Sequence, residues 1–206
     1  MVSKKELAII LSRLRKYDKA SVKLEQYITD SEIASDVLWQ AYMHKDIEDK
    51  TIADFGSGTG ILGIGCLILG AKKVCFVEID EYAIEIAKKN LEDIKKLIKI
   101  EGKAEFINND ISNFNDKVDV VIQNPPFGTK QKHIDKKFLE KSFKISRKIY
   151  SFHKLTSGEF LDAMSKDYNF KVVDILSFNF PLKQTMKFHR KRVEKIEVGC
   201  WVLEKI

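Results

Sequence analysis

Short, nearly continuous apolar runs alternate with helical patterns along most of this chain. The runs that read as strands are residues 50–56, 72–80, 104–110, 117–127, 148–154, 170–180 and 194–206. Strands buried on both faces are typical of parallel sheets, in which helices cover both sides. The alternation therefore predicts an α/β fold built on a mostly parallel seven-stranded sheet.

The last two runs, 170–180 and 194–206, have no helical pattern between them. We therefore expect them to pair antiparallel and to close the sheet, with the segment between them as a loop. Two helical patterns, at residues 4–17 and 31–45, precede the first strand. With 206 residues, of which 44% are hydrophobic, the chain fits one domain, residues 1–206.

Composition indicates the cellular compartment in which this domain folds. Cys66, Cys75 and Cys200 are scattered in apolar sequence without C-x-x-C spacing, so we expect buried free thiols in a reducing compartment. The N-terminal apolar run is too short and too charged for a signal peptide or a membrane span. We expect a soluble, cytoplasmic protein. The four histidines have no ligand spacing, so no bound metal is predicted.

A glycine cluster, DFGSGTGILG, follows the first strand. Glycines at the carboxyl end of a parallel strand let the backbone turn tightly and approach a ligand closely. Gly58, Gly60 and Gly63 formally fit the dinucleotide fingerprint, but the preceding Asp54 would repel a pyrophosphate. A carboxylate favours the ammonium and sulfonium groups of S-adenosylmethionine instead. Glycines that merely pack helix on strand are the structural alternative.

Polar residues also end the second and third strands. Glu78, in Val77-Glu78-Ile79-Asp80, is placed to accept the two ribose hydroxyls of an adenosine, whereas Asp80 fits a helix cap. Asp110 follows the third strand and can read the adenine amino group, with Ile111 against the adenine face. An Asx turn at Asp110 is the alternative.

The fourth strand runs into Gln123-Asn124-Pro125-Pro126-Phe127. The prolines fix the backbone. The Asn124 amide oxygen and the Pro125 carbonyl can then both accept hydrogen bonds from a planar NH2 group. Two acceptors would aim the nitrogen lone pair at a methyl donor, and Phe127 offers a face for stacking a flipped base. A rigid turn with Phe127 in the core is the alternative.

The segments DFGSGTG, VEID, NND and NPPF together resemble those of a Rossmann-like class I S-adenosylmethionine-dependent methyltransferase. From about Leu24 onward, LEQYITDSEIA, NPPFGTK, YSFHK and KFHRKRVEKIEV are similar to the methyltransferase-like ribosomal RNA adenine-N6 family of archaea and eukaryotes. In relatives Asp often stands at the position of Glu78. The resemblance implies N6 methylation of an adenine in RNA, most specifically in ribosomal RNA.

By this resemblance, residues 1–48 contribute to a lid over the cofactor and 49–206 form the Rossmann-like core. The residues that it implies for cofactor binding, together with those argued above, are Gln26, Tyr27, Thr29, Asp54, Gly56, Gly58, Thr59, Gly60, Ile61, Glu78, Ile79, Asp110, Ile111 and Asn124. The catalytic set is Asn124, Pro125, Pro126 and Phe127. The family also implies a small zinc-binding activator subunit that pairs with the edge of the third strand.

A basic segment late in the chain suggests nucleic acid as the substrate. Residues predicted to contact RNA are His153, Lys154, Lys187, His189, Arg190, Lys191 and Arg192. Clustered cations neutralise phosphates and make binding depend on salt. A solvated charged loop explains the same cluster without RNA, and His153 can also act as a helix cap.

Other functions share parts of this pattern. A protein-glutamine N5 methyltransferase uses similar Asn-Pro-Pro chemistry, but usually has a larger N-terminal helical domain than the roughly 50 residues found here. A DNA adenine-N6 methyltransferase normally carries a target-recognition domain. An inactive methyltransferase-like RNA-binding module is disfavoured because Asp54, Glu78 and Asn124 are all present.

Overall fold

The computed structural model describes residues 2–18, 28–126, 134–181 and 195–206. It contains one seven-stranded sheet in the order β3-β2-β1-β4-β5-β7-β6. The strands are β1 (Thr51–Phe55), β2 (Lys73–Glu78), β3 (Lys103–Asn108), β4 (Val120–Gln123), β5 (Lys148–Lys154), β6 (Phe170–Pro181) and β7 (Lys195–Lys205).

The strands β1 to β5 pair in parallel, and β7 pairs antiparallel with both β5 and β6. The predicted mostly parallel sheet with an antiparallel final strand is therefore confirmed. The strand order reverses between β1 and β4, and in open sheets of this kind the ligand binds at such a switch point.

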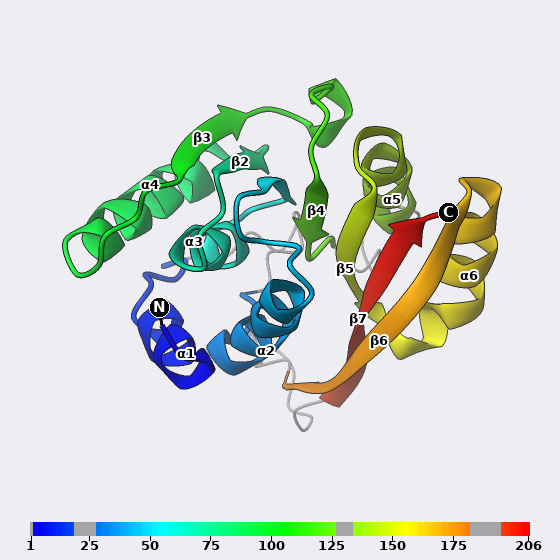
Figure 1. Ribbon diagram of the computed structural model, residues 1–206, viewed down its shortest axis with the longest axis horizontal. Coiled ribbons are helices and arrows are strands. Elements are labelled where there is room, and N and C mark those ends of the chain that lie inside the picture. The colour runs from blue at the N-terminus through cyan, green and yellow to red at the C-terminus, as the bar shows by residue number, and fades with distance from the viewer. Residues whose placement is uncertain (1, 19–27, 127–133, 182–194) are drawn as a thin grey trace.

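Helices cover both faces of the sheet, as Figure 1 shows. They are α1 (Lys4–Ser12), α2 (Ser31–Met43), α3 (Ile61–Ile68), α4 (Glu81–Lys95), α5 (Ile134–Ile145) and α6 (Gly158–Asp167), with short 3-10 turns η1 (Ile111–Asn113) and η2 (Leu155–Ser157). None of the helices in the described ranges is long and apolar enough to cross a membrane.

Alternating strand residues pack into two separate hydrophobic cores, one on each face of the sheet. In β2, Val74 and Phe76 pack on the face of α1 to α4, whereas Cys75 and Val77 pack on the face of α5 and α6. The alternation follows from the two-residue period of a strand. Because both faces are buried, a one-residue slip would exchange the two sets of side chains, so the register at the site is firmly specified.

Helix starts follow local capping chemistry. Asp30 caps α2 by accepting from the Glu32 N–H, and Asp80 caps α4 by accepting from the Tyr82 N–H. The three cysteines are free and buried, as predicted.

The first helix, however, ends at Ser12 and not near residue 17. Residues 13–18 instead contact α4, and these contacts matter for the site.

Candidate active site

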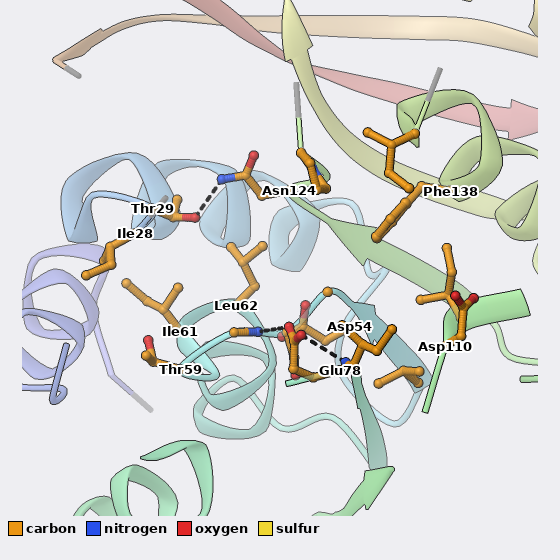
Figure 2. A pocket seen from close by; sticks show the side chains of 18 of the residues that line it. Ile28, Thr29, Asp54, Thr59, Ile61, Leu62, Glu78, Asp110, Asn124 and Phe138 are labelled. Atoms are coloured by element: carbon orange, nitrogen blue, oxygen red, sulfur yellow. Dashed lines mark hydrogen bonds between the residues drawn. The ribbon is translucent and has the colours of Figure 1, made fainter. Parts of the chain in front are cut away.

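A cavity of about 340 Å³ opens at the carboxyl ends of β1, β2 and β4. This volume lies within the range of small-molecule sites. The predicted residues that line it are Thr29, Asp54, Gly56, Gly58, Thr59, Ile61, Glu78, Ile79, Asp110, Ile111, Asn124 and Pro126. Figure 2 shows Thr29 and Asn124 on one side of the cavity and Asp54 and Glu78 together on another.

The turn after β1 has backbone conformations that favour glycine. Gly56, Gly58 and Gly60 have φ values of 64°, 53° and 88°, in the left-handed region. A Cβ added to Gly56 would lie 3.1 Å from the Phe138 ring. The backbone is thereby exposed to the cavity, and a ligand can approach it closely.

Asp54 ends in this cavity but is only 1% exposed to solvent. Its Oδ2 accepts a hydrogen bond of 2.8 Å from the Gly63 N–H. Burial raises the pKa of the Asp54 carboxyl to about 7, although the Gly63 bond opposes the shift. Among the described residues this buried carboxylate has one backbone donor, so a ligand cation would stabilise its ionised form.

Glu78 is held by three backbone N–H groups. Its Oε2 accepts from Gly58 at 2.9 Å, and its Oε1 accepts from Ile79 at 2.9 Å and Asp80 at 3.0 Å. Burial raises the pKa of the Glu78 carboxyl, against these three bonds, which favour the charged form. The glycine turn and the end of β2 are thereby tied together, with the carboxylate oriented toward the cavity.

Asp110 adopts the Asx geometry that the sequence left open. Its Oδ1 accepts from the Ser112 N–H at 2.8 Å, and this bond lowers the pKa of the Asp110 carboxyl. Because Oδ1 is engaged, Oδ2 is the oxygen available to a ligand amino group. The cap and the proposed contact with adenine are therefore compatible.

The orientation of the Asn124 amide is set by a residue far away in the sequence. Asn124 Nδ2 donates to the buried Thr29 Oγ1 at 3.0 Å. With the amide nitrogen engaged in this way, Oδ1 remains as the hydrogen-bond acceptor. The arrangement supplies an acceptor, not a donor, to whatever amine enters beside Asn124.

Ser57 provides an independent test of whether the cavity fits a polar ligand. Ser57 lines the cavity, and its buried Oγ has no hydrogen-bond partner among the described residues. Buried polar atoms are rarely left unpaired. This orphan hydroxyl, the glycine turn and the two acidic strand ends fit a cationic nucleoside such as S-adenosylmethionine.

Some predicted residues do not line the cavity. Gly60 is the residue before α3, and Pro125 follows Asn124, but neither contributes to the lining. Lys154 is the last residue of β5 and is not among the residues that line the cavity. The predictions for Gln26, Tyr27, Phe127, Lys187, His189, Arg190, Lys191 and Arg192 lie outside the described residues.

The prediction that His153 contacts RNA is wrong for its side chain, which is 1% exposed. It lies opposite Gly199 of β7, its ring packs edge-on against Trp201, and its Nε2 is 2.7 Å from Ser151 Oγ. Burial lowers the pKa of His153 to about 3, so the ring is neutral. The pairing of β5 with β7 covers this residue, and the strand pattern alone could not show that.

The cavity also contains residues that the sequence reasoning missed. They are Tyr17, Ile28, Ser57, Leu62, Val77, Ile134, Lys137 and Phe138. Ser57 and Leu62 stand inside the glycine motif, which was a usable signal. Tyr17, Lys137 and Phe138 come from segments distant in sequence, and no motif pointed to them.

This strand order, with its switch-point cavity, glycine turn and acidic strand ends, defines a class I S-adenosylmethionine-dependent methyltransferase. A family model described as "Methyltransferase small domain" matches residues 29–150. The chain belongs to this family, and the sequence-based assignment is confirmed.

Relatives match over nearly the whole chain. The rRNA N(6)-adenosine-methyltransferase METTL5 of Danio rerio is 32% identical over 94% of this chain and 95% of its own length. The MJ0284 protein of Methanocaldococcus jannaschii is 34% identical over 100% of this chain and 96% of its own. The solved structure of PH1948 from Pyrococcus horikoshii, described as a candidate RNA methyltransferase, has 41% identity, a TM-score of 0.88, and coverage of 100% and 98%.

Proposed function

We propose that this protein methylates the exocyclic N6 amine of an adenine in RNA, with ribosomal RNA as the substrate class. The observation that carries the proposal is the Asn124 amide, which Thr29 fixes with its oxygen free to accept from an amine beside the cavity. The name of the Danio rerio relative, an rRNA N(6)-adenosine methyltransferase, supports the same reaction.

The chain's own groups bind and orient the reactants. We place Glu78 on the ribose hydroxyls, Asp110 on the adenine amino group of the cofactor, and Asp54 and Thr29 near its methionine end. When bound, S-adenosylmethionine supplies an electrophilic methyl group on a positively charged sulfur. The sulfonium favours an ionised Asp54, and this pairing offsets part of the cost of burying that carboxylate.

Asn124 acts on the substrate amine. Its Oδ1 and the Pro125 carbonyl accept the two N–H bonds of the target NH2, which draws the nitrogen lone pair out of conjugation and aims it at the methyl carbon. With the cofactor bound, the lone pair would face its methyl group, and the C–S electron pair would stay on sulfur as the N–C bond formed. The methylated nitrogen would lose one proton to water, so the site needs no strong general base.

A labelling experiment tests the reaction. The protein is incubated with methyl-labelled donor and total RNA from cells that lack it, and the RNA is digested to nucleosides. We expect label in N6-methyladenosine, in material sensitive to ribonuclease and resistant to protease. Label in protein would favour the glutamine alternative, label in DNA the DNA alternative, and no label the inactive binding module.

The basic segment gives a second prediction. Replacing Lys191 and Arg192 with alanine should weaken RNA binding and lower the slope of log affinity against log salt by about 1.4 to 1.8, because each lost phosphate contact accounts for roughly 0.7 to 0.9. Filter binding across salt concentrations measures this. Lys95 and Lys96, exposed at the end of α4, provide a matched control pair. An unchanged slope would assign Lys191 and Arg192 to solvation alone.

We also propose that the edge of β3 receives a small zinc-binding activator subunit. Within the described part of the chain, β3 pairs only with β2, so its outer edge offers unpaired backbone groups. Hydrogen exchange with and without a co-purified partner tests this. We expect new protection of β3 amides and none at β6; protection elsewhere with β3 unchanged would contradict the assignment.

A further inference from the structure

Tyr17 lies in the cofactor cavity although it comes from a segment before the sheet. It is half-buried, lines the cavity and approaches the glycine turn so closely that a Cβ built on Gly58 would lie 2.8 Å from its hydroxyl oxygen. The Tyr17 hydroxyl has no hydrogen bond to any described residue. It is a polar group that faces a ligand site and has no hydrogen-bond partner in the described part of the chain.

A buried asparagine fixes the backbone beside Tyr17. Asn90 of α4 is 1% exposed, and its Oδ1 accepts from the Arg15 N–H at 2.7 Å. Its Nδ2 donates to the Arg15 carbonyl at 3.1 Å and to the Thr59 carbonyl at 2.9 Å. One side chain therefore joins residues 13–18, which we call the N-terminal strap, to the glycine turn.

Two surface contacts hold the rest of the N-terminal strap on the same helix. Arg15 pairs with Asp93 through a bond of 2.8 Å from Nη2 and one of 3.2 Å from Nε. The Tyr82 hydroxyl donates to Asp18 at 3.1 Å. Exposed contacts of this kind each contribute little. Together with Asn90 they fix the strap on both sides of Tyr17.

The electrostatic surroundings keep the Tyr17 phenol protonated. Burial, followed by the nearby carboxylates of Glu78, Asp80 and Asp54, raises its pKa well above the ordinary value. The hydroxyl is therefore available as a donor, whereas the Glu78 carboxyl already acts as an acceptor, for the Gly58, Ile79 and Asp80 N–H groups. A donor and an acceptor beside the same stretch of the glycine turn match a sugar diol, whose hydroxyls both donate and accept.

We propose that Tyr17 is a further cofactor-binding residue, whose hydroxyl contacts the ribose hydroxyls that Glu78 accepts. The inference rests on the proposed cofactor site and adds to it a wall supplied by the N-terminal strap. It also accounts for the departure of residues 13–18 from the helix, since a longer α1 would carry Tyr17 away from Gly58.

Calorimetric binding of S-adenosylhomocysteine tests the proposal. We expect Tyr17→Phe to bind about fivefold more weakly, the usual effect of one lost hydrogen bond. The control is Tyr168→Phe, because Tyr168 stacks on Phe143 at the end of α6; this variant should bind as the unmodified protein does. A ligand that lacks both ribose hydroxyls should bind Tyr17→Phe and the unmodified protein equally. Equal binding of the complete ligand by both would overturn the proposal.

The same titration separates this inference from the proposed function. If the unmodified protein does not bind S-adenosylhomocysteine, the cofactor site itself fails; if it binds and Tyr17→Phe is unaffected, only the role of Tyr17 fails. Asn90→Ala should weaken binding at least as much as Tyr17→Ala, and adding Tyr17→Ala to it should cause no further loss. Strictly additive losses would show that Asn90 does not act through Tyr17.

Discussion

Replacing Asn124 with alanine is expected to lower the turnover number by about 100- to 1000-fold, the usual effect of removing one group that stabilises developing charge at a reacting centre. The substrate amine loses the acceptor that aims its lone pair. S-adenosylhomocysteine should still bind within about threefold, because Asp54, Glu78 and the glycine turn remain. Single-turnover rates with saturating donor, together with calorimetry, measure both quantities.

Two further variants control for this result. Asn124→Asp keeps an oxygen acceptor and should retain more activity than alanine. Thr29→Val keeps the shape of Thr29 but removes the acceptor that holds Asn124 Nδ2. With saturating donor, it should lower turnover by about tenfold, equivalent to about 1.4 kcal/mol of lost orientation. Normal turnover in Asn124→Ala would remove Asn124 from the mechanism.

Replacing Asp54 with asparagine should stabilise the cofactor-free protein at pH 8. Burial raises the pKa of Asp54 from 3.8 to about 7, so between these values the folded state binds a proton that the unfolded state does not. This stabilising contribution is complete below about pH 4 and is lost as the pH rises through 7. At pH 8 both states are ionised, and the buried charge lowers stability by roughly a few kcal/mol.

Urea denaturation at pH 5 and pH 8 without cofactor measures this effect. The unmodified protein should be less stable at pH 8, whereas Asp54→Asn should lose much less stability between the two. A variant that is no more stable than the parent at pH 8 would show that ionised Asp54 carries no such penalty.

The same substitution should weaken binding of S-adenosylmethionine at pH 8 by about 10- to 100-fold, the usual range for a lost charge-assisted hydrogen bond. Asp54→Asn would then be more stable but bind its cofactor poorly. Affinity of the unmodified protein should also fall as the pH drops below 7, since the protonated carboxyl no longer attracts a cation. A pH-independent affinity would place the cationic end of the cofactor elsewhere.

Much of the site could be read from local patterns, because its groups stand at strand ends. Asp54, Glu78 and Asn124 each follow an apolar strand, and parallel strands bring their carboxyl ends to one edge. The glycine cluster predicted a tight turn, and its glycines do adopt positive φ values. The position of Asp80 before a helical pattern predicted its role as a helix cap.

The first helix shows what local patterns cannot decide. Leu7, Leu11 and Leu14 keep helical spacing and are all buried, yet α1 ends at Ser12. Asn90 offers the Arg15 backbone both an acceptor and a donor, which replace the hydrogen bonds that a longer helix would provide. A tertiary contact thus overrides periodicity.

The alternating α/β architecture, the glycine turn and the acidic and amide groups at the strand ends can all be predicted from the sequence, because each depends on residues within a few positions. Packing between distant elements sets three other features: Thr29 orients Asn124, β7 covers His153, and Tyr17 faces the glycine turn. These contacts join segments 41 to 95 residues apart. Their partners are set by packing between elements, for which no local spacing provides a signal.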